Sequence, residues 1–190
     1  TSGTPLLDPF CGSGTIAIEA ALAACGVAPG LKRRFLFENF SGFDHEAWRE
    51  ELEEAKAQVN MHADVHIAAS DISTIVVGKA EQNARRAGLG ALIDDGRLRF
   101  SQCDARAVTP PATAGLIVAN PPYGEQSNPK SATVASMMKD VADNLKNNFS
   151  GWTARFLTSD RNLPHQMRLK ESKKTPLFNG PLECRFFEFN

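Results

Sequence analysis

Short apolar runs alternate along this chain with longer segments that have helical periodicity. The apolar runs predict five strands, at residues 6–7, 65–69, 97–100, 115–119 and 153–158. An alanine-rich segment at 16–24 and an amphipathic segment at 131–149 predict helices between them. Residues 175–178 and 184–189 flank an Asn-Gly-Pro turn and predict a closing antiparallel pair. This order predicts an α/β domain with a mainly parallel sheet and helices on both faces.

The strand predicted at 115–119 runs directly into Asn120-Pro121-Pro122-Tyr123. The two prolines lack backbone donors and bias Asn120 away from helical geometry, so the strand stops abruptly. A side-chain amide, bare carbonyls and an aromatic ring are left at its carboxyl end. These groups suit a planar amino group, which donates hydrogen bonds while the ring stacks on its flat system. The structural alternative is a tight loop after a central strand.

A second informative segment, Asp8-Pro9-Phe10-Cys11-Gly12-Ser13-Gly14-Thr15, joins the first strand to the first helix. Its glycines let the backbone approach a ligand closely, as in nucleotide-binding α/β units. The carboxylate of Asp8 disfavours a phosphate, and the lysine of a P-loop is missing. The segment therefore favours a ligand with a cationic end, such as an amino acid moiety. Gly26 is predicted to end the helix that follows.

Together these two segments resemble the cofactor and catalytic motifs of class I S-adenosylmethionine (SAM)-dependent methyltransferases, in the branch that methylates exocyclic amines. The resemblance implies a Rossmann-like, seven-stranded and mainly parallel sheet with an antiparallel C-terminal hairpin. It also implies an acid after strand two for the ribose hydroxyls and an acid after strand three for the adenine amine. Asp71 and Asp104 stand at these places. The alternatives are a helix N-cap for Asp71 and an ordinary turn aspartate for Asp104.

The resemblance also assigns roles within the site. The expected catalytic residues are Asn120, Pro121, Pro122 and Tyr123. The expected cofactor-binding residues are Asp8, Pro9, Cys11, Gly12, Ser13, Gly14, Thr15, Asp71, Ile72, Asp104, Ala105 and Asn120. The implied mechanism is direct displacement, in which the amine attacks the sulfonium methyl and the enzyme contributes mainly positioning. No general base is evident, so the proton is expected to leave after methyl transfer.

An insertion of about residues 27–64 follows the first helix. Asp71 lies 57 positions after Gly14, whereas a minimal dinucleotide unit has its ribose acid roughly 20 residues past the glycines. The insertion holds five aromatic side chains, Phe35, Phe37, Phe40, Phe43 and Trp48. We expect them to pack the insertion back onto the sheet. The alternative is that a ring or an arginine stacks on a nucleobase.

The insertion makes the resemblance specific to one group within these methyltransferases. Its Arg-Phe-x-Phe-Glu, Gly-Phe-Asp and Trp pattern is similar to the bacterial large-subunit ribosomal RNA guanine-N2 methyltransferase (RlmL) family, whose members carry an RNA-binding THUMP domain. The segments 79–89 and 178–185 are similar to the same family's later helix and closing hairpin. The resemblance implies methylation of guanine N2 in 23S ribosomal RNA. It also implies that residues 1–190 form a single catalytic domain, excised from an upstream THUMP region that does most of the RNA recognition.

Composition adds little to this picture. The net charge is −1, so bulk charge gives no support to RNA binding. Two basic clusters are candidates for contact with phosphate, and the alternative is that each forms a solvated face. They are residues 32–34 and the set Arg168, Lys170, Lys173 and Lys174. Four scattered cysteines and four histidines lack metal-ligand spacing, so no metal is expected. Free cysteines suit the reducing cytoplasm, and no signal peptide or membrane-spanning run appears.

Three rival functions remain on sequence grounds. An adenine-N6 DNA methyltransferase shares the catalytic motif but would need a region that recognises its DNA target. A protein glutamine methyltransferase also shares both motifs, but the insertion disfavours it. A non-catalytic SAM-binding module is the third rival, and the intact Asn120-Pro121-Pro122-Tyr123 motif argues against it. The sequence leaves open the nucleotide that is modified and the oligomeric state.

Overall fold

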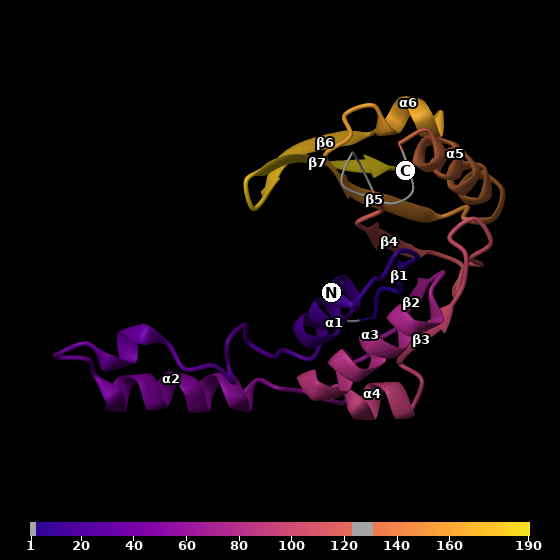
Figure 1. Cartoon of the computed structure of the whole chain (residues 1–190). Helices are drawn as coiled ribbons and strands as arrows, with labels where there is room; N and C mark the ends of the chain where they lie inside the picture. Colours follow the sequence, from indigo (N-terminus) through magenta and orange to yellow (C-terminus); the bar gives the residue numbers. More distant parts are fainter. Residues whose placement is uncertain (1–2, 123–130) are drawn as a thin grey trace.

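The computed structural model describes residues 3–122 and 131–190, and within them the chain forms one seven-stranded sheet (Figure 1). The strands are β1 Leu6–Asp8, β2 Ile67–Asp71, β3 Leu98–Gln102, β4 Gly115–Ala119, β5 Trp152–Thr158, β6 Lys173–Asn179 and β7 Leu182–Phe189. Their order is β3-β2-β1-β4-β5-β7-β6, in which β7 runs antiparallel to both of its neighbours and the other pairs are parallel. The predicted fold class is confirmed.

Helices cover both faces of the sheet. The helices α1 Thr15–Ala24, α3 Thr74–Ala87 and α4 Gly90–Asp94 share one hydrophobic cluster with β2 and β3. The helices α5 Ser131–Asn148 and α6 Leu163–Met167 share another with β4, β5 and β7. The five-residue helices α4 and α6 were not predicted, because so short a segment shows no helical periodicity.

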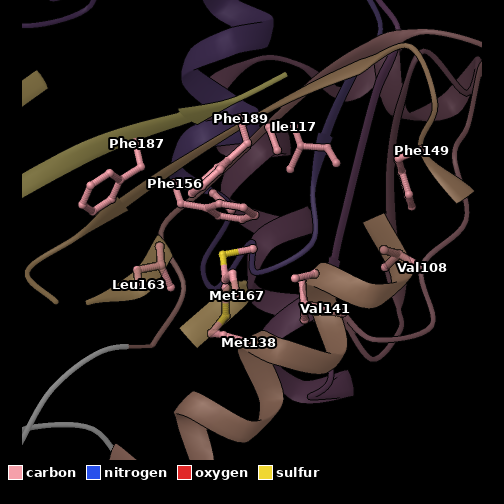
Figure 2. Close-up of a cluster of buried hydrophobic side chains, with 14 of the residues drawn as sticks. Val108, Ile117, Met138, Val141, Phe149, Phe156, Leu163, Met167, Phe187 and Phe189 are labelled. Atoms are coloured by element: carbon pink, nitrogen blue, oxygen red, sulfur yellow. The ribbon is translucent and has the colours of Figure 1, made fainter. Parts of the chain in front are cut away.

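The larger cluster lies between α5, α6 and the sheet (Figure 2). Phe156 and Phe187 enter it from β5 and β7, and Met138 and Met167 enter it from the two helices; all four are buried. The predicted apolar face of the helix at 131–149 is therefore a core face, and its methionines fill the irregular space between rings. This packing holds β4 and β5 in place. The Asn-Pro-Pro segment follows the carboxyl end of β4, and the carboxyl end of β5 lies beside it.

The insertion forms an arm that projects away from the sheet (Figure 1). It contains the 3-10 helix η1 Leu36–Asn39 and the helix α2 His45–Ala57, which Asp44 caps through its carboxylate. The rings of Phe35 and Phe37 stack at 5.1 Å, and Trp48 meets Phe37 edge-on at 5.3 Å. The expectation that these aromatics pack onto the sheet is wrong. The rings instead cover one another only in part inside the arm and stay half-buried, while Phe40 is 68% exposed.

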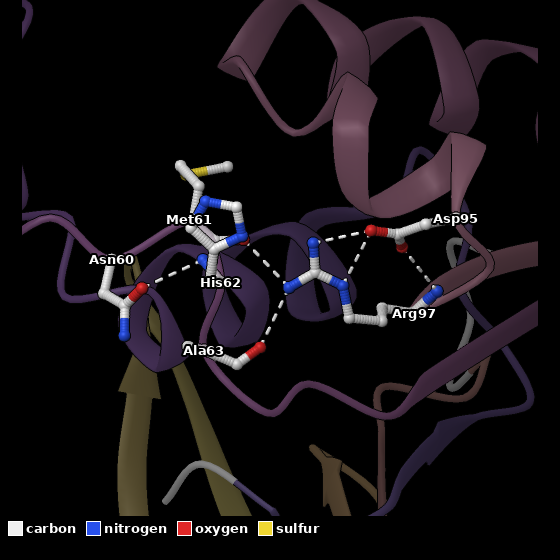
Figure 3. A network of polar contacts seen from close by, with 6 residues as sticks. All are labelled: Asn60, Met61, His62, Ala63, Asp95 and Arg97. Carbon is white, nitrogen blue, oxygen red and sulfur yellow. Dashed lines mark hydrogen bonds and ion pairs between the residues drawn. The ribbon is translucent and has the colours of Figure 1, made fainter.

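Arg97 anchors the returning end of the arm (Figure 3). Its Nη1 donates to the carbonyl oxygens of Met61 at 2.8 Å and Ala63 at 2.9 Å. Its Nη2 pairs with Asp95 Oδ2 at 2.6 Å. Because α1 runs back from the carboxyl edge of the sheet and β2 starts at the amino edge, the arm is rooted at the amino edge. The arm therefore leaves the sheet at the edge opposite the predicted site.

Candidate cofactor and active site

The sheet register brings the predicted site residues to one edge. Asp8 ends β1 and pairs with Ala69, two positions before Asp71. Asp71 in turn pairs with Gln102, two positions before Asp104. On the other side Leu7 pairs with Ile117, three positions before Asn120. Since these strands are parallel, the four polar residues lie along the carboxyl edge, around the β1–β4 switch point where α/β sheets bind ligands.

Asp8 is buried in an unusual state for a carboxylate. It is 1% exposed, and its Oδ1 accepts a hydrogen bond from the Phe10 N–H at 3.1 Å. Its buried Oδ2 has no hydrogen-bond partner among the described residues. Burial raises the pKa of Asp8 to about 7, against the lowering effect of the Phe10 bond, and the charge of Asp71 raises it further. A buried acceptor left in this way fits a ligand that brings a donor, above all a cationic one.

The two glycines of the turn have different tasks. Both have positive φ, 52° at Gly12 and 90° at Gly14. A Cβ on Gly14 would lie 3.1 Å from the Cβ of Ala80 in α3, so this glycine allows α1 and α3 to approach closely. A Cβ on Gly12 would meet nothing within 4 Å, so Gly12 borders open space. A ligand held against the backbone could use that space.

Asp71 joins the end of β2 to the glycine turn. Its Oδ2 accepts the Gly12 N–H at 3.2 Å, and its Oδ1 accepts the Ser73 N–H at 2.9 Å. The N-cap of α3 is Ser73, whose hydroxyl accepts the Val76 N–H. The N-cap alternative for Asp71 is therefore wrong. Each carboxylate oxygen keeps acceptor capacity for a hydroxyl group.

The carboxylate of Asp104 already has an ion-pair partner, Arg106, which the sequence analysis did not predict. Arg106 pairs with it, Nη2 to Oδ2 at 2.6 Å, and the Arg106 backbone N–H also donates to Oδ1. The hydrogen bond from the Arg106 side chain lowers the pKa of Asp104. The turn-aspartate alternative describes its backbone contact correctly. A ligand amine at this position would share the carboxylate with the guanidinium. The neighbouring Ala105 is buried.

Two apolar side chains stand exposed beside Asp71. Ile72 is 65% exposed and Ile75 is 74% exposed. Ile72 was predicted; Ile75 was missed, although its place in the first turn of α3, three residues after Ile72, was the available signal. A further missed residue is Asn83, whose side-chain amide donates to the Ser13 carbonyl at 3.0 Å and so fixes the turn from α3. Exposed isoleucines at a polar edge suit the face of a flat aromatic ligand.

The remaining predicted residues divide by exposure. Asn120 is exposed directly after β4, Pro121 is buried and Pro122 half-buried, whereas Tyr123 lies outside the described residues. Ser13 is exposed on the turn, Thr15 is exposed at the start of α1, and Pro9 is buried. Burial raises the pKa of the Cys11 thiol to about 12, so Cys11 stays protonated and packs as a small apolar side chain.

Within the described parts of the chain, no cluster of three or more His, Cys, Asp or Glu side chains could hold a metal ion. Nor do these described residues include a helix whose length and apolar character would let it cross a membrane.

Comparison with known proteins places this geometry in a family. The RMKL-like methyltransferase domain family (UPF0020) matches residues 1–187. The Ribosomal RNA large subunit methyltransferase K/L of Shewanella sp. (strain ANA-3) is 44% identical over 187 residues, which are 96% of this chain and 25% of that protein. The chain thus spans about a quarter of the length of the curated relatives it matches.

Two solved structures share the fold over nearly the whole chain. SMU.472, solved in complex with SAH, has a TM-score of 0.87 at 28% identity, covering 99% of this chain and 48% of its own. A predicted N6-adenine-specific DNA methylase from Listeria monocytogenes has a TM-score of 0.84 at 30% identity, covering 98% and 46%. With the match over residues 1–187, these likenesses establish that the chain belongs to the RMKL-like methyltransferase domain family.

Proposed function

We propose that this domain transfers a methyl group from SAM to an exocyclic amine of an RNA base, namely guanine N2 in large-subunit ribosomal RNA. The observation that carries the proposal is the buried Asp8 carboxylate, with an unpartnered oxygen beside the glycine turn and on the same sheet edge as Asn120. The names of the Shewanella relatives, as large-subunit ribosomal RNA methyltransferases, and the SAH complex of SMU.472 support it. On this proposal the protein works in the cytoplasm, which suits its free cysteines.

The residues of the edge fit the polar groups of SAM. Asp8 would accept from the ammonium of the methionine part, and Asp71 would accept from the ribose hydroxyls. Ile72 and Ile75 would contact the face of the adenine, while Asp104 would accept from its amine. The other predicted residues would line the cofactor through backbone or short side chains; they are Pro9, Cys11, Gly12, Ser13, Gly14, Thr15 and Ala105.

When bound, SAM supplies an electrophilic sulfonium methyl group. The chain's own part is to present the amine. The Asn120 side-chain oxygen and the Pro121 carbonyl accept hydrogen bonds from the amine and turn its lone pair toward the methyl. Both acceptors also stabilise the positive charge that develops on the nitrogen. The ring of Tyr123, which lies outside the described residues, is proposed to stack on the base, with Pro122 stiffening the loop.

A second candidate is adenine-N6 methylation of DNA. The observation that favours it is the likeness to the Listeria protein, whose name states that activity as a prediction. Its target is also an exocyclic amine, so Asn120 and Pro121 would have the same task. The products differ, since the first candidate yields N2-methylguanosine and the second yields N6-methyldeoxyadenosine.

Calorimetric titration of this chain with SAM and with SAH tests the cofactor site. We expect both to bind, and we expect Asp71→Ala to abolish the signal without loss of the fold, checked by circular dichroism. Failure of the native chain to bind SAM would contradict the proposal. Methyl transfer from labelled SAM to unmodified ribosomal RNA and to duplex DNA, followed by nucleoside analysis, then decides between the two substrates.

A further inference from the structure

A groove rich in basic side chains lies on α6 and the segment that follows it. Its lining includes Arg161, His165, Arg168 and Lys170, with Glu171 as the acidic member, and its volume is about 770 Å³. The four basic side chains are exposed. Within the described ranges, no carboxylate lies within ion-pair distance of Arg168 or Lys170. We call this feature the basic groove.

The charge of this region departs from that of the whole chain. The groove lining holds three Lys or Arg residues and one Glu, whereas the chain as a whole has a net charge of −1. The rest of the chain is therefore acidic, and the local field of the groove favours an anion. Arg161 pairs with Glu183 at 2.8 Å, and Glu183 also pairs with Arg185, so the wall of the groove is fixed to β7.

One end of the basic groove, at Arg161, lies near the proposed active site. Ala119 pairs with Phe156 in the β4–β5 register, so Asn120 lies level with Leu157 on the adjacent strand. Arg161 follows Leu157 by four residues, just beyond the end of β5. Adjacent strands lie about 4.8 Å apart. Leu169, by contrast, borders Phe149 and Trp152 at the amino end of β5. A polynucleotide whose base meets Asn120 could therefore run its backbone past Arg161 and then along the groove toward Arg168 and Lys170.

The backbone of Arg168 has a left-handed conformation that is unfavourable for a residue with a Cβ. Among the described residues it is the one non-glycine residue with positive φ, at φ 51° and ψ 39°, where α6 ends. Glycine, or else asparagine, usually occupies this place at a helix end, because a Cβ is disfavoured there. A long cationic side chain held at such a position indicates a role for the side chain rather than for the turn.

We infer that the basic groove binds the sugar–phosphate backbone of the RNA substrate as the strand leaves the target nucleotide, with Arg168 and Lys170 contacting phosphates further along the strand. The inference deepens the proposed function and rests on it. Phosphate contacts position a nucleic acid without reading its sequence. The groove would thus set the register in which the base reaches Asn120.

The test compares three forms of the chain: native, Arg168→Gly with Lys170→Ala, and the control Arg34→Ala. Arg34 is an exposed cation of the arm, rooted at the opposite sheet edge. Anisotropy of a fluorescein-labelled transcript of large-subunit ribosomal RNA is measured from 50 to 200 mM salt. We expect the groove variant to lose roughly tenfold in affinity, and the salt slope to fall by about 1 for each cation removed. The control should match the native chain.

Two further readouts separate this inference from its alternatives. The single variant Arg168→Gly should melt at the same temperature as the native chain or higher, since glycine suits the positive φ, and SAM titration should be unchanged. Equal RNA affinity in the groove variant and the control would overturn the inference, as would absence of RNA binding by the native chain at 50 mM salt. Equal, Arg168-dependent binding of polyglutamate would also overturn it, by indicating an acidic protein partner. If the native chain neither bound SAM nor transferred a methyl group, that result would instead count against the proposed function.

Discussion

The backbone N–H of Gly12 donates a hydrogen bond to Asp71 Oδ2 at 3.2 Å, although 59 positions separate the two residues. The contact joins the glycine turn after β1 to the end of β2. The turn proposed to line the methionine part of the cofactor and the carboxylate proposed to hold its ribose are thus already held to each other. Such preorganisation lowers the entropy lost when a ligand binds. It also means that changes at Asp71 act on the turn as well as on a ribose.

The two glycines of the turn are expected to respond differently to alanine. Gly14→Ala should lower the free energy of unfolding by about 2–3 kcal/mol, since a Cβ at positive φ would also crowd Ala80. Gly12→Ala should cost only about 1 kcal/mol for its positive φ. Its Cβ enters the open space of the proposed site, so SAM affinity should fall at least tenfold. Urea denaturation and calorimetry measure the two effects. Equal stability of both variants would contradict this division of tasks.

The positions of some candidate site residues could be predicted, because a polar residue directly after a predicted strand marks the carboxyl edge of the sheet. The strand-end positions of Asp8, Asp71 and Asn120 follow from the alternation of strands and helices, and the structure confirms that edge. The Asp104–Arg106 pair was not predictable, because a partner two residues away depends on the turn that joins them. The arm was mispredicted for a similar reason. Aromatic content indicates that rings will find contacts, but it does not show whether they pack on the sheet or on Trp48.

The buried state of Asp8 predicts a pH dependence. Its pKa is raised from 3.8 to about 7 in the folded protein, so the folded state holds the proton more tightly than the unfolded chain. The stability this group contributes to the ligand-free protein is therefore complete below about pH 4 and is lost as pH rises through 7. Asp8→Asn, which stays neutral, should remove this dependence. Thermal melting of both proteins between pH 4 and 8 measures it, and parallel curves would argue against a buried, titrating Asp8.

Cofactor affinity should follow the opposite trend. A cationic ammonium needs the ionised carboxylate, so lowering the pH from 7.5 to 5.5 should weaken SAM binding by up to roughly 25-fold for a group with a pKa of about 7. Asp8→Asn should bind SAM weakly at every pH in this range. Calorimetry at four pH values is sufficient. A flat profile in the native chain would remove Asp8 from the ammonium contact.

Asn120 is expected to act on transfer and not on cofactor binding. It is exposed directly after β4, at the carboxyl edge of the sheet. Asn120→Ala should abolish methyl transfer, a loss of at least 10²-fold if its acceptor contributes as a single oxyanion-hole donor does. The dissociation constant for SAM should change less than threefold. Asn120→Asp, which keeps the acceptor oxygens, is the matched variant and should retain more activity. A strong loss of SAM affinity in Asn120→Ala would assign this residue to the cofactor instead.

Arg97 is expected to control the arm without affecting the site. Its guanidinium donates to two carbonyl groups at the arm's root and also pairs with Asp95 (Figure 3). The Arg97 side chain is 22% exposed. Arg97→Ala should lower the free energy of unfolding by about 2 kcal/mol, because charge-assisted bonds to two carbonyls are lost. Arg97→Lys should recover only part of this, since one ammonium cannot span the same acceptors. Amide hydrogen exchange in α2 should quicken in Arg97→Ala, while SAM affinity stays native because the arm is rooted at the opposite edge of the sheet. If SAM affinity fell together with protection of α2, the arm and the site would be coupled, and the separation inferred from the topology would be wrong.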